Sequence, residues 1–162
     1  LDVNFLHHDI LNDTIDSLPQ DLDILISNPP YIPISEKENL HRNVKDYEPD
    51  SALFVPDSAP LIFYKRIAQV GIELLKPTGV LFFETYHLFQ NQMVEMLQSL
   101  GYKQVVITKD LQGKSRFVEA SMSEWFRFGR SGASAQASAA VELSAQISRL
   151  TLLLQVITKT NS

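Results

Sequence analysis

The sequence predicts an α/β fold: a doubly wound, largely parallel sheet with helices on both faces. Two observations lead to this prediction. From residue 21 to residue 120, short β-prone runs alternate with segments of helical periodicity, which is the pattern of parallel strands joined by crossover helices. In addition, Asp21–Ser27 is a continuous β-prone run bounded by turn residues, as in strands that are covered on both faces.

The first part of the chain is predicted to supply two strands and a long loop. Val3–Leu6 is a short apolar run that leads to Asp9, and we expect a buried strand there. The second strand is stopped by Pro29 and Pro30, since neither can donate a ladder hydrogen bond. Residues 32–57 are polar and proline-rich with no clear period, which is typical of a functional or disordered loop.

The second part of the chain alternates helices and strands. Helical spacing predicts helices over Ala59–Lys76 and Leu88–Leu100, ended by Pro77-Thr78-Gly79 and by Gly101. The second helix is expected to bury Met93, Met96, Leu97 and Leu100. Strands are predicted at Val80–Glu84 and Lys103–Thr108, with one or two closing antiparallel strands at Ser115–Ala120 and Trp125–Phe128.

Three polar residues follow predicted strands. Asp9, Asn28 and Glu84 each come at the carboxyl end of one of them. Ligands of open α/β sheets bind beyond these ends. We therefore expect the three side chains to converge on one cleft.

Composition narrows the class of protein. The chain has 162 residues, enough for one domain with a core, and its 44% apolar residues and net charge of −5 are those of a mildly acidic globular protein. The acidity disfavours direct nucleic-acid binding. The absence of cysteine excludes disulfides and Cys-ligated zinc, and it fits a cytoplasmic location. We expect no signal peptide and no membrane span.

The motif Asn28-Pro29-Pro30-Tyr31 directly follows the second predicted strand. An amide or aromatic amine delocalises its nitrogen lone pair, so the nitrogen attacks a methyl donor only when acceptors hold its N–H groups. The side-chain carbonyl of Asn28 and the backbone carbonyl of Pro29 can be these acceptors. The prolines stiffen the turn and bring no competing donor, and Tyr31 offers a flat surface. Catalysis would then come from orientation and desolvation. The alternative is a turn that merely ends the strand.

The resemblance of the chain to a known family extends well beyond this motif. It covers about residues 2–119. The matching segments are Asp23–Pro33, Asp46–Pro49, Ala52-Leu53, Phe63-Tyr64, Leu75–Gly79, Phe83-Glu84 and Lys109–Arg116. These segments resemble the release-factor glutamine methyltransferases, the PrmC/HemK family.

Members of this family transfer a methyl group from S-adenosyl-L-methionine to the side-chain amide of the glutamine in the Gly-Gly-Gln loop of peptide-chain release factors. The resemblance implies a Rossmann-like class I methyltransferase sheet, S-adenosyl-L-methionine as cofactor and a release factor as partner. It implies no metal. It assigns substrate binding and catalysis to Asn28, Pro29, Pro30 and Tyr31, and cofactor binding to Asp9 (adenine amino group), Ile10 (adenine face) and Asn28.

The chain also departs from the family. The family's glycine-rich cofactor loop and its ribose-binding acidic residue lie upstream of Leu1 by family order, as does a helical release-factor-binding domain. We therefore expect residues 1–120 to form a partial methyltransferase domain that lacks the N-terminal strands and has weak or no activity alone. Thr85-Tyr86 replaces the smaller residues usual after Glu84.

Residues 121–162 match nothing in the family and are predicted to be a divergent tail. Residues 131–140 are rich in Ser, Ala and Gly, as in a linker. After them, apolar residues recur at spacings of four and three. Two heptads are too few for a stable coiled coil, so an amphipathic helix on its own domain, or a poorly ordered tail, is favoured. The stripe consists of Leu143, Ile147, Leu150, Leu154 and Ile157.

Other polar residues are weaker candidates. His7 and His8 are adjacent, so in a strand they point to opposite faces and do not chelate one metal. For Glu84, a hydrogen bond to the Asn28 turn is favoured over a role as general base. Glu48 either fastens the long loop or faces water. Three basic residues are interpreted as a solvated hairpin: Lys109, Lys114 and Arg116.

Two further functions stay open. Asn-Pro-Pro-Tyr also serves nucleic-acid amino-methyltransferases acting on adenine N6 or guanine N2, although the acidic composition disfavours this class. The missing glycine-rich loop raises a third hypothesis, an inactive fragment that acts as a binding module.

Overall fold

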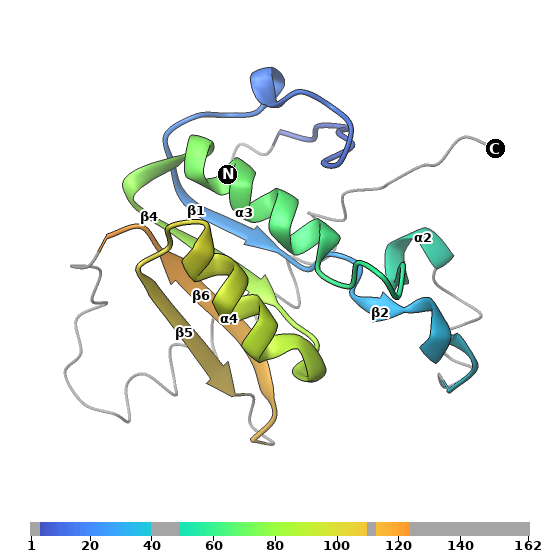
Figure 1. Cartoon of the computed structure of the whole chain (residues 1–162). Coiled ribbons are helices and arrows are strands. Elements are labelled where there is room, and N and C mark those ends of the chain that lie inside the picture. Colours follow the sequence, from blue (N-terminus) through green and yellow to red (C-terminus); the bar gives the residue numbers. More distant parts are fainter. Residues whose placement is uncertain (1–3, 40–48, 110–112, 124–162) are drawn as a thin grey trace.

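The computed structural model describes residues 4–39, 49–109 and 113–123, and the account below is limited to them. Two sheets and two longer helices make up this part of the chain (Figure 1). The strands are β1 (Leu22–Ser27), β2 (Ile32–Pro33), β3 (Phe54–Val55), β4 (Leu75–Glu84), β5 (Gln104–Lys109) and β6 (Ser115–Ser121). The helices are α2 (Asp50–Leu53), α3 (Ile62–Leu74) and α4 (Gln90–Ser99), with 3-10 turns η1 (Ile15–Ser17), η2 (Ile34–Asn39) and η3 (His87–Phe89).

The main sheet has the strand order β1-β4-β6-β5. The β1–β4 pair is parallel, whereas β6 runs antiparallel to both β4 and β5. The chain reaches β4 from β1 through α3, and it reaches β5 from β4 through α4, as expected for crossover helices. This confirms the α/β fold class, the parallel pair and the antiparallel strand at Ser115–Ala120. The expected largely parallel sheet with helices on both faces is not seen in the described residues, where β6 lies antiparallel between β4 and β5, and α3 and α4 share one face (Figure 1).

Helices α3 and α4 pack side by side on one face of the sheet (Figure 1). The predicted inward face of α4 is confirmed: Met93 and Leu97 are fully buried, and Met96 and Leu100 pack at the edge of the core. Gly101, at φ +99°, ends the helix as predicted, because glycine adopts this backbone conformation without strain. The core residues of α3 include Phe63, Tyr64, Ile67, Ala68, Val70 and Leu74.

The predicted end of the first helix was misplaced. The helix stops at Leu74, and β4 begins at Leu75 and runs through Pro77. A bulge makes this possible, because the register passes from Leu22↔Leu75 directly to Ile24↔Val80. The intervening residues of β4 loop out of the ladder, so the missing N–H of Pro77 breaks no strand pairing. Gly79 is required there, since a Cβ atom would lie 2.8 Å from the backbone oxygen of Leu22.

The predicted strand at Val3–Leu6 is wrong for the described residues 4–6, which belong to no strand. The side chains of Phe5 and Leu6 are exposed rather than buried. The prediction that the strand at Asp21–Ser27 is covered on both faces also fails in part, because Ile24 is 46% exposed. Strand β1 lies at the edge of the described sheet and pairs with β4 on one side only, so its side chains have fewer described neighbours than those of a central strand.

The long loop predicted over residues 32–57 contains a small lobe of its own. In this lobe β2 pairs in parallel with β3, and η2 and α2 pack beside them (Figure 1). Some earlier predictions lie outside the described residues and stay predictions. These are the role of Glu48, the strand at Trp125–Phe128, the linker at 131–140 and the apolar stripe from Leu143 to Ile157.

Candidate functional site

The sheet register brings two of the predicted site residues together. Ser27 at the end of β1 pairs with Phe83 of β4, so the next residues, Asn28 and Glu84, are neighbours at the same carboxyl edge. The register thus places these two residues at one edge of the sheet, as expected, whereas a cleft that their side chains share stays a prediction. Asp9 differs, because it lies in a loop and not at a strand end.

The Asn28 corner is only partly buried. Pro29 is buried, whereas Asn28, Pro30 and Tyr31 are each half-buried. Within the described part of the chain, the Asn28 side chain makes no hydrogen bond. Its polar atoms are not buried, so they remain accessible to solvent. Its carbonyl is therefore available as an acceptor for an incoming group.

Two stacked tyrosines stand beside the corner. The rings of Tyr31 and Tyr86 have centroids 5.7 Å apart and planes that differ by 15°. The ring of Phe89 lies against that of Tyr86, with ring centroids 6.1 Å apart. Tyr31 follows Pro30 directly, whereas Tyr86 comes two residues after the end of β4, so the pair joins the small lobe to the main sheet.

Side-chain hydrogen bonds hold η2 in place. The hydroxyl of Tyr86 donates to Oε2 of Glu36 over 2.7 Å. Asp57 accepts hydrogen bonds from the backbone N–H and the hydroxyl of Ser35, at 3.2 and 2.5 Å, and these bonds lower the pKa of Asp57. A further ion pair joins Lys37 of η2 to Asp50 of α2.

The end of β4 is fastened from two sides. The buried hydroxyl of Tyr64 donates to the backbone carbonyl of Glu84 over 2.8 Å, and the backbone N–H of Thr85 donates to the carbonyl of Arg116 on β6. Burial raises the pKa of Tyr64 well above its ordinary value, so its hydroxyl keeps its proton at neutral pH. The backbone beside Asn28 is thus held by α3 and by β6.

The carboxylate of Glu84 does not make the expected hydrogen bond to the Asn28 turn. Within the described residues it has no hydrogen-bond partner. Burial raises the pKa of Glu84, and the positive charge of Arg116 partly opposes this shift. The contact that fixes this end of β4 is instead the hydrogen bond from Tyr64 to the backbone carbonyl of Glu84.

Asp9 is the hub of a tight turn. Its carboxylate accepts hydrogen bonds from the backbone N–H of Leu11 at 3.0 Å and from Nδ2 of Asn12 at 2.8 Å. The bond from Asn12 is the main cause of a lowered pKa of Asp9. A carboxylate has about four lone-pair positions, so one further donor, such as an amino group, can still be accepted.

Ile10 occupies a different environment from the one its predicted role requires. Its side chain is 7% exposed and belongs to the hydrophobic core, and Nε of Arg66 on α3 donates to its carbonyl over 3.0 Å. Asp9 therefore fits an adenine amino group, whereas Ile10 in this conformation does not present a face to the ring. Its contact with adenine stays a prediction that requires this loop to rearrange.

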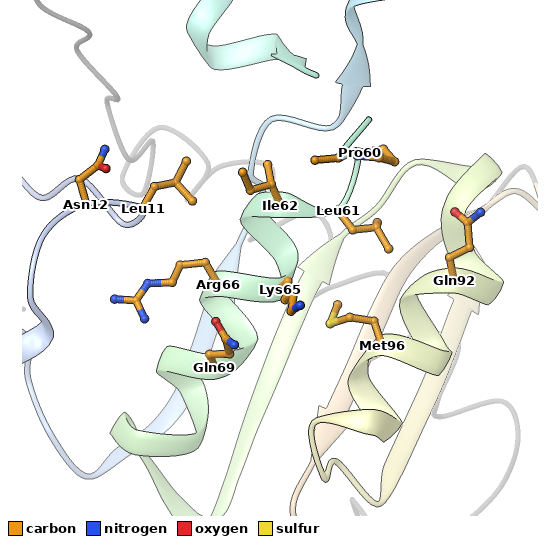
Figure 2. Close-up of a pocket in the computed structure, with 11 residues that line it drawn as sticks. Leu11, Asn12, Pro60, Leu61, Ile62, Lys65, Arg66, Gln69, Gln92 and Met96 are labelled. Atoms are coloured by element: carbon orange, nitrogen blue, oxygen red, sulfur yellow. The ribbon is translucent and has the colours of Figure 1, made fainter. Parts of the chain in front are cut away.

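A hollow of about 840 Å³ lies over α3 and α4 beside this loop. Figure 2 shows Leu11 and Asn12 on one side, Arg66 and Gln69 from α3 below them, and Met96 from α4 on the other. None of residues 28–31 lines it. This hollow could not be predicted from the sequence, because its lining combines helix surface and loop residues that are far apart in the chain.

Other expectations concern histidines, metals and membranes. Nδ1 of His8 lies 3.8 Å from Oδ2 of Asp13. The Nε2 atom of His8 is buried and has no hydrogen-bond partner among the described residues. Across residues 4–39, 49–109 and 113–123 no group of three or more His, Asp or Glu side chains is arranged to hold a metal. No helix in the same ranges has the length and apolar character needed to cross a membrane.

Two residues at the site were not predicted from the sequence. Tyr86 was noted only as a departure from the expected small residue, and Glu36 was not singled out. The unusual bulk of Tyr86 was the available signal. Its partners lie in the long loop, which has no periodicity from which contacts could be inferred.

A parallel β1–β4 pair, an antiparallel closing strand β6 and a polar proline corner at the carboxyl edge define a Rossmann-like methyltransferase fold. Comparison with known proteins narrows this class. The chain is 46% identical over 99 residues to a release factor glutamine methyltransferase of Bacteroides thetaiotaomicron, covering 61% of the chain and 36% of that protein. The chain is homologous to part of the release factor glutamine methyltransferases.

Two further relatives carry the same name. The protein of Flavobacterium psychrophilum is 36% identical over 121 residues, which cover 75% of the chain and 42% of that protein. The protein of Clostridium botulinum is 35% identical over 128 residues, covering 72% and 44%. The chain thus spans about two fifths of the length of the curated relatives it matches. No family model matches the chain.

Proposed function

We propose that this chain is the substrate-orienting part of a methyltransferase that modifies the side-chain amide nitrogen of a glutamine in peptide-chain release factors. The relatives' names support a release factor as the protein substrate. The observation that carries the proposal is the Asn28 corner, whose side chain is half-buried, held beside Glu84 and not engaged by any described residue.

The residues of the corner act on the substrate amide. The Asn28 side-chain carbonyl and the Pro29 backbone carbonyl accept hydrogen bonds from the two N–H groups of the amide. These bonds weaken the delocalisation of the nitrogen lone pair and aim it at the methyl group. Pro30 keeps the corner stiff, and Tyr31 packs beside the amide plane. The rate enhancement then comes from the orientation that the two carbonyl acceptors impose in a site with little water, whereas the packing of Tyr31 contributes to substrate binding.

S-adenosyl-L-methionine would supply the methyl group as an electrophilic sulfonium. On this chain, Asp9 is the residue that fits its adenine amino group, through the lone pairs its turn leaves free. We propose that residues 1–120 are the catalytic part, that residues 121–162 are a separate tail, and that the protein is cytoplasmic.

The test is a methylation assay. The protein, expressed with any flanking sequence that its gene encodes, is incubated with a release factor and radiolabelled S-adenosyl-L-methionine. Label is expected in the release factor and not in a variant whose Gly-Gly-Gln glutamine is replaced by alanine. Equal labelling of the two release factors, or labelling of free DNA or RNA alone, would overturn the proposal.

A further inference from the structure

The end of β4 carries a residue whose contacts reach across the site. Tyr86 stacks on Tyr31, with centroids 5.7 Å apart and planes within 15°, and the ring of Phe89 supports it at 6.1 Å. An offset stack of this kind stabilises the relative orientation of two rings. The ring plane of Tyr31 is therefore set from outside its own segment.

The hydroxyl of Tyr86 is anchored as well. It donates a hydrogen bond of 2.7 Å to Glu36, which belongs to η2 of the small lobe. This hydrogen bond to the Glu36 carboxylate raises the pKa of Tyr86 to about 12, so the Tyr86 hydroxyl keeps its proton at neutral pH. A bond at the far end of the ring and a stack on its face together restrict its rotation.

These contacts connect the lobe to the sheet. Tyr31 and Glu36 lie on either side of β2, whereas Tyr86 lies just beyond β4. A shift of the lobe relative to the sheet would break both the stack and the hydrogen bond. The stack thus couples the geometry of Tyr31 beside the Asn28 corner to a side chain at the end of β4.

We propose that Tyr86 is a positioning residue for substrate binding: its ring sets the plane of Tyr31, and Glu36 holds the ring of Tyr86 in place. The inference rests on the proposed function, because the plane of Tyr31 matters only where a planar amide packs beside it.

The expected kinetic signature is specific. Packing beside Tyr31 is the same in the ground state and in the transition state, so its loss weakens binding without slowing the chemical step. Tyr86→Ala should raise KM for the release factor by roughly five- to tenfold, the range of one aromatic contact, with kcat changed less than about twofold.

Two milder variants separate the hydrogen bond from the ring. Tyr86→Phe keeps the stack and loses only the bond to Glu36, and Glu36→Ala removes the same bond from the other side. Each should raise KM by about two- to threefold, and the double variant should match the single ones, because both substitutions break one interaction. Independent, multiplying effects would contradict the role of Glu36.

Three outcomes of the kinetic series overturn the proposal. They are unchanged kinetics of Tyr86→Ala, a fall in its kcat at constant KM, and the failure of Tyr86→Phe to restore most of the lost affinity. Asn28→Ala serves as the reference for the proposed function itself. If that variant retains full turnover, the function assigned to the corner fails, whatever Tyr86 does.

A second measurement needs no activity. The ring-proton resonances of Tyr31 in the 162-residue chain report the ring current of Tyr86. They should be nearly the same in the unsubstituted protein and in Tyr86→Phe, and they should move in Tyr86→Ala. Identical Tyr31 resonances in all three proteins would overturn the positioning role even if release-factor methylation is absent.

Discussion

The hydroxyl of Tyr64, buried in α3, donates a 2.8 Å hydrogen bond to the backbone carbonyl of Glu84 at the end of β4. The same ring meets Phe83 edge-to-face, with centroids 5.1 Å apart and planes at 88°. Since Glu84 is the parallel neighbour of Asn28, this contact ties the packing of α3 to the position of the corner.

Tyr64→Phe removes this bond from the buried end of β4. We expect the free energy of unfolding to fall by about 1–2 kcal/mol, because a buried carbonyl loses a partner. Methyl transfer should also weaken, through the displaced strand end. The matched control is Tyr102→Phe, which breaks a buried hydrogen bond from another tyrosine hydroxyl, to the carbonyl of Ala68. Tyr102→Phe should lower the free energy of unfolding in urea by a similar amount but leave the rate of methyl transfer unchanged.

Gly79→Ala tests the bulge between β1 and β4. The added methyl group would lie 2.8 Å from the backbone oxygen of Leu22 and 3.0 Å from Cβ of Leu75. We expect a destabilisation of about 1–3 kcal/mol, because backbone cannot move aside as easily as a flexible side chain. Thr78→Ala, at an exposed neighbouring position, should stay within about 0.5 kcal/mol. Equal unfolding midpoints for the two variants would show that the bulge tolerates a side chain.

Glu84→Gln probes the cost of a partly buried charge. Burial raises the folded-state pKa of Glu84, so the native protein binds this proton more tightly than the unfolded chain does. The stability from this preference is complete below the ordinary pKa of 4.5 and is lost as pH rises through the folded-state pKa. Glu84→Gln should therefore raise the urea midpoint modestly at pH 7 and have little effect at pH 4. A variant that is less stable at pH 7 would point to a favourable ion pair with Arg116.

Asn28→Ala is the direct test of the corner. Loss of an orienting carbonyl should lower kcat/KM at least about a hundredfold, or about 3 kcal/mol of transition-state stabilisation. Cofactor affinity, measured by calorimetry, should change far less. Asn91→Ala, at an exposed position of α4, provides a control for asparagine removal and should behave as the unsubstituted protein. If turnover and cofactor affinity fall equally in Asn28→Ala, Asn28 holds the cofactor instead.

Much of the architecture follows from local patterns. The alternation of β-prone runs and helical spacing predicts β1, α3, α4, β5 and β6 close to their observed bounds, since period and flanking glycine or proline are properties of short segments. The same logic places Asn28 and Glu84 at one edge, because parallel strands end on the same side of a sheet.

Contacts between distant segments could not be inferred in this way. The bulge that admits Pro77 into β4, the burial of Ile10 and the exposure of Ile24 depend on which segments are neighbours in space.

The amino-acid sequence by itself determined the order of the elements and the stiff polar corner at Asn28, because both depend on the local conformational preferences of a few consecutive residues. Only the tertiary structure decided that Tyr86 stacks on Tyr31 and binds Glu36. These residues are brought together by the packing of the small lobe against the end of β4, a long-range arrangement with no periodic signal in the chain.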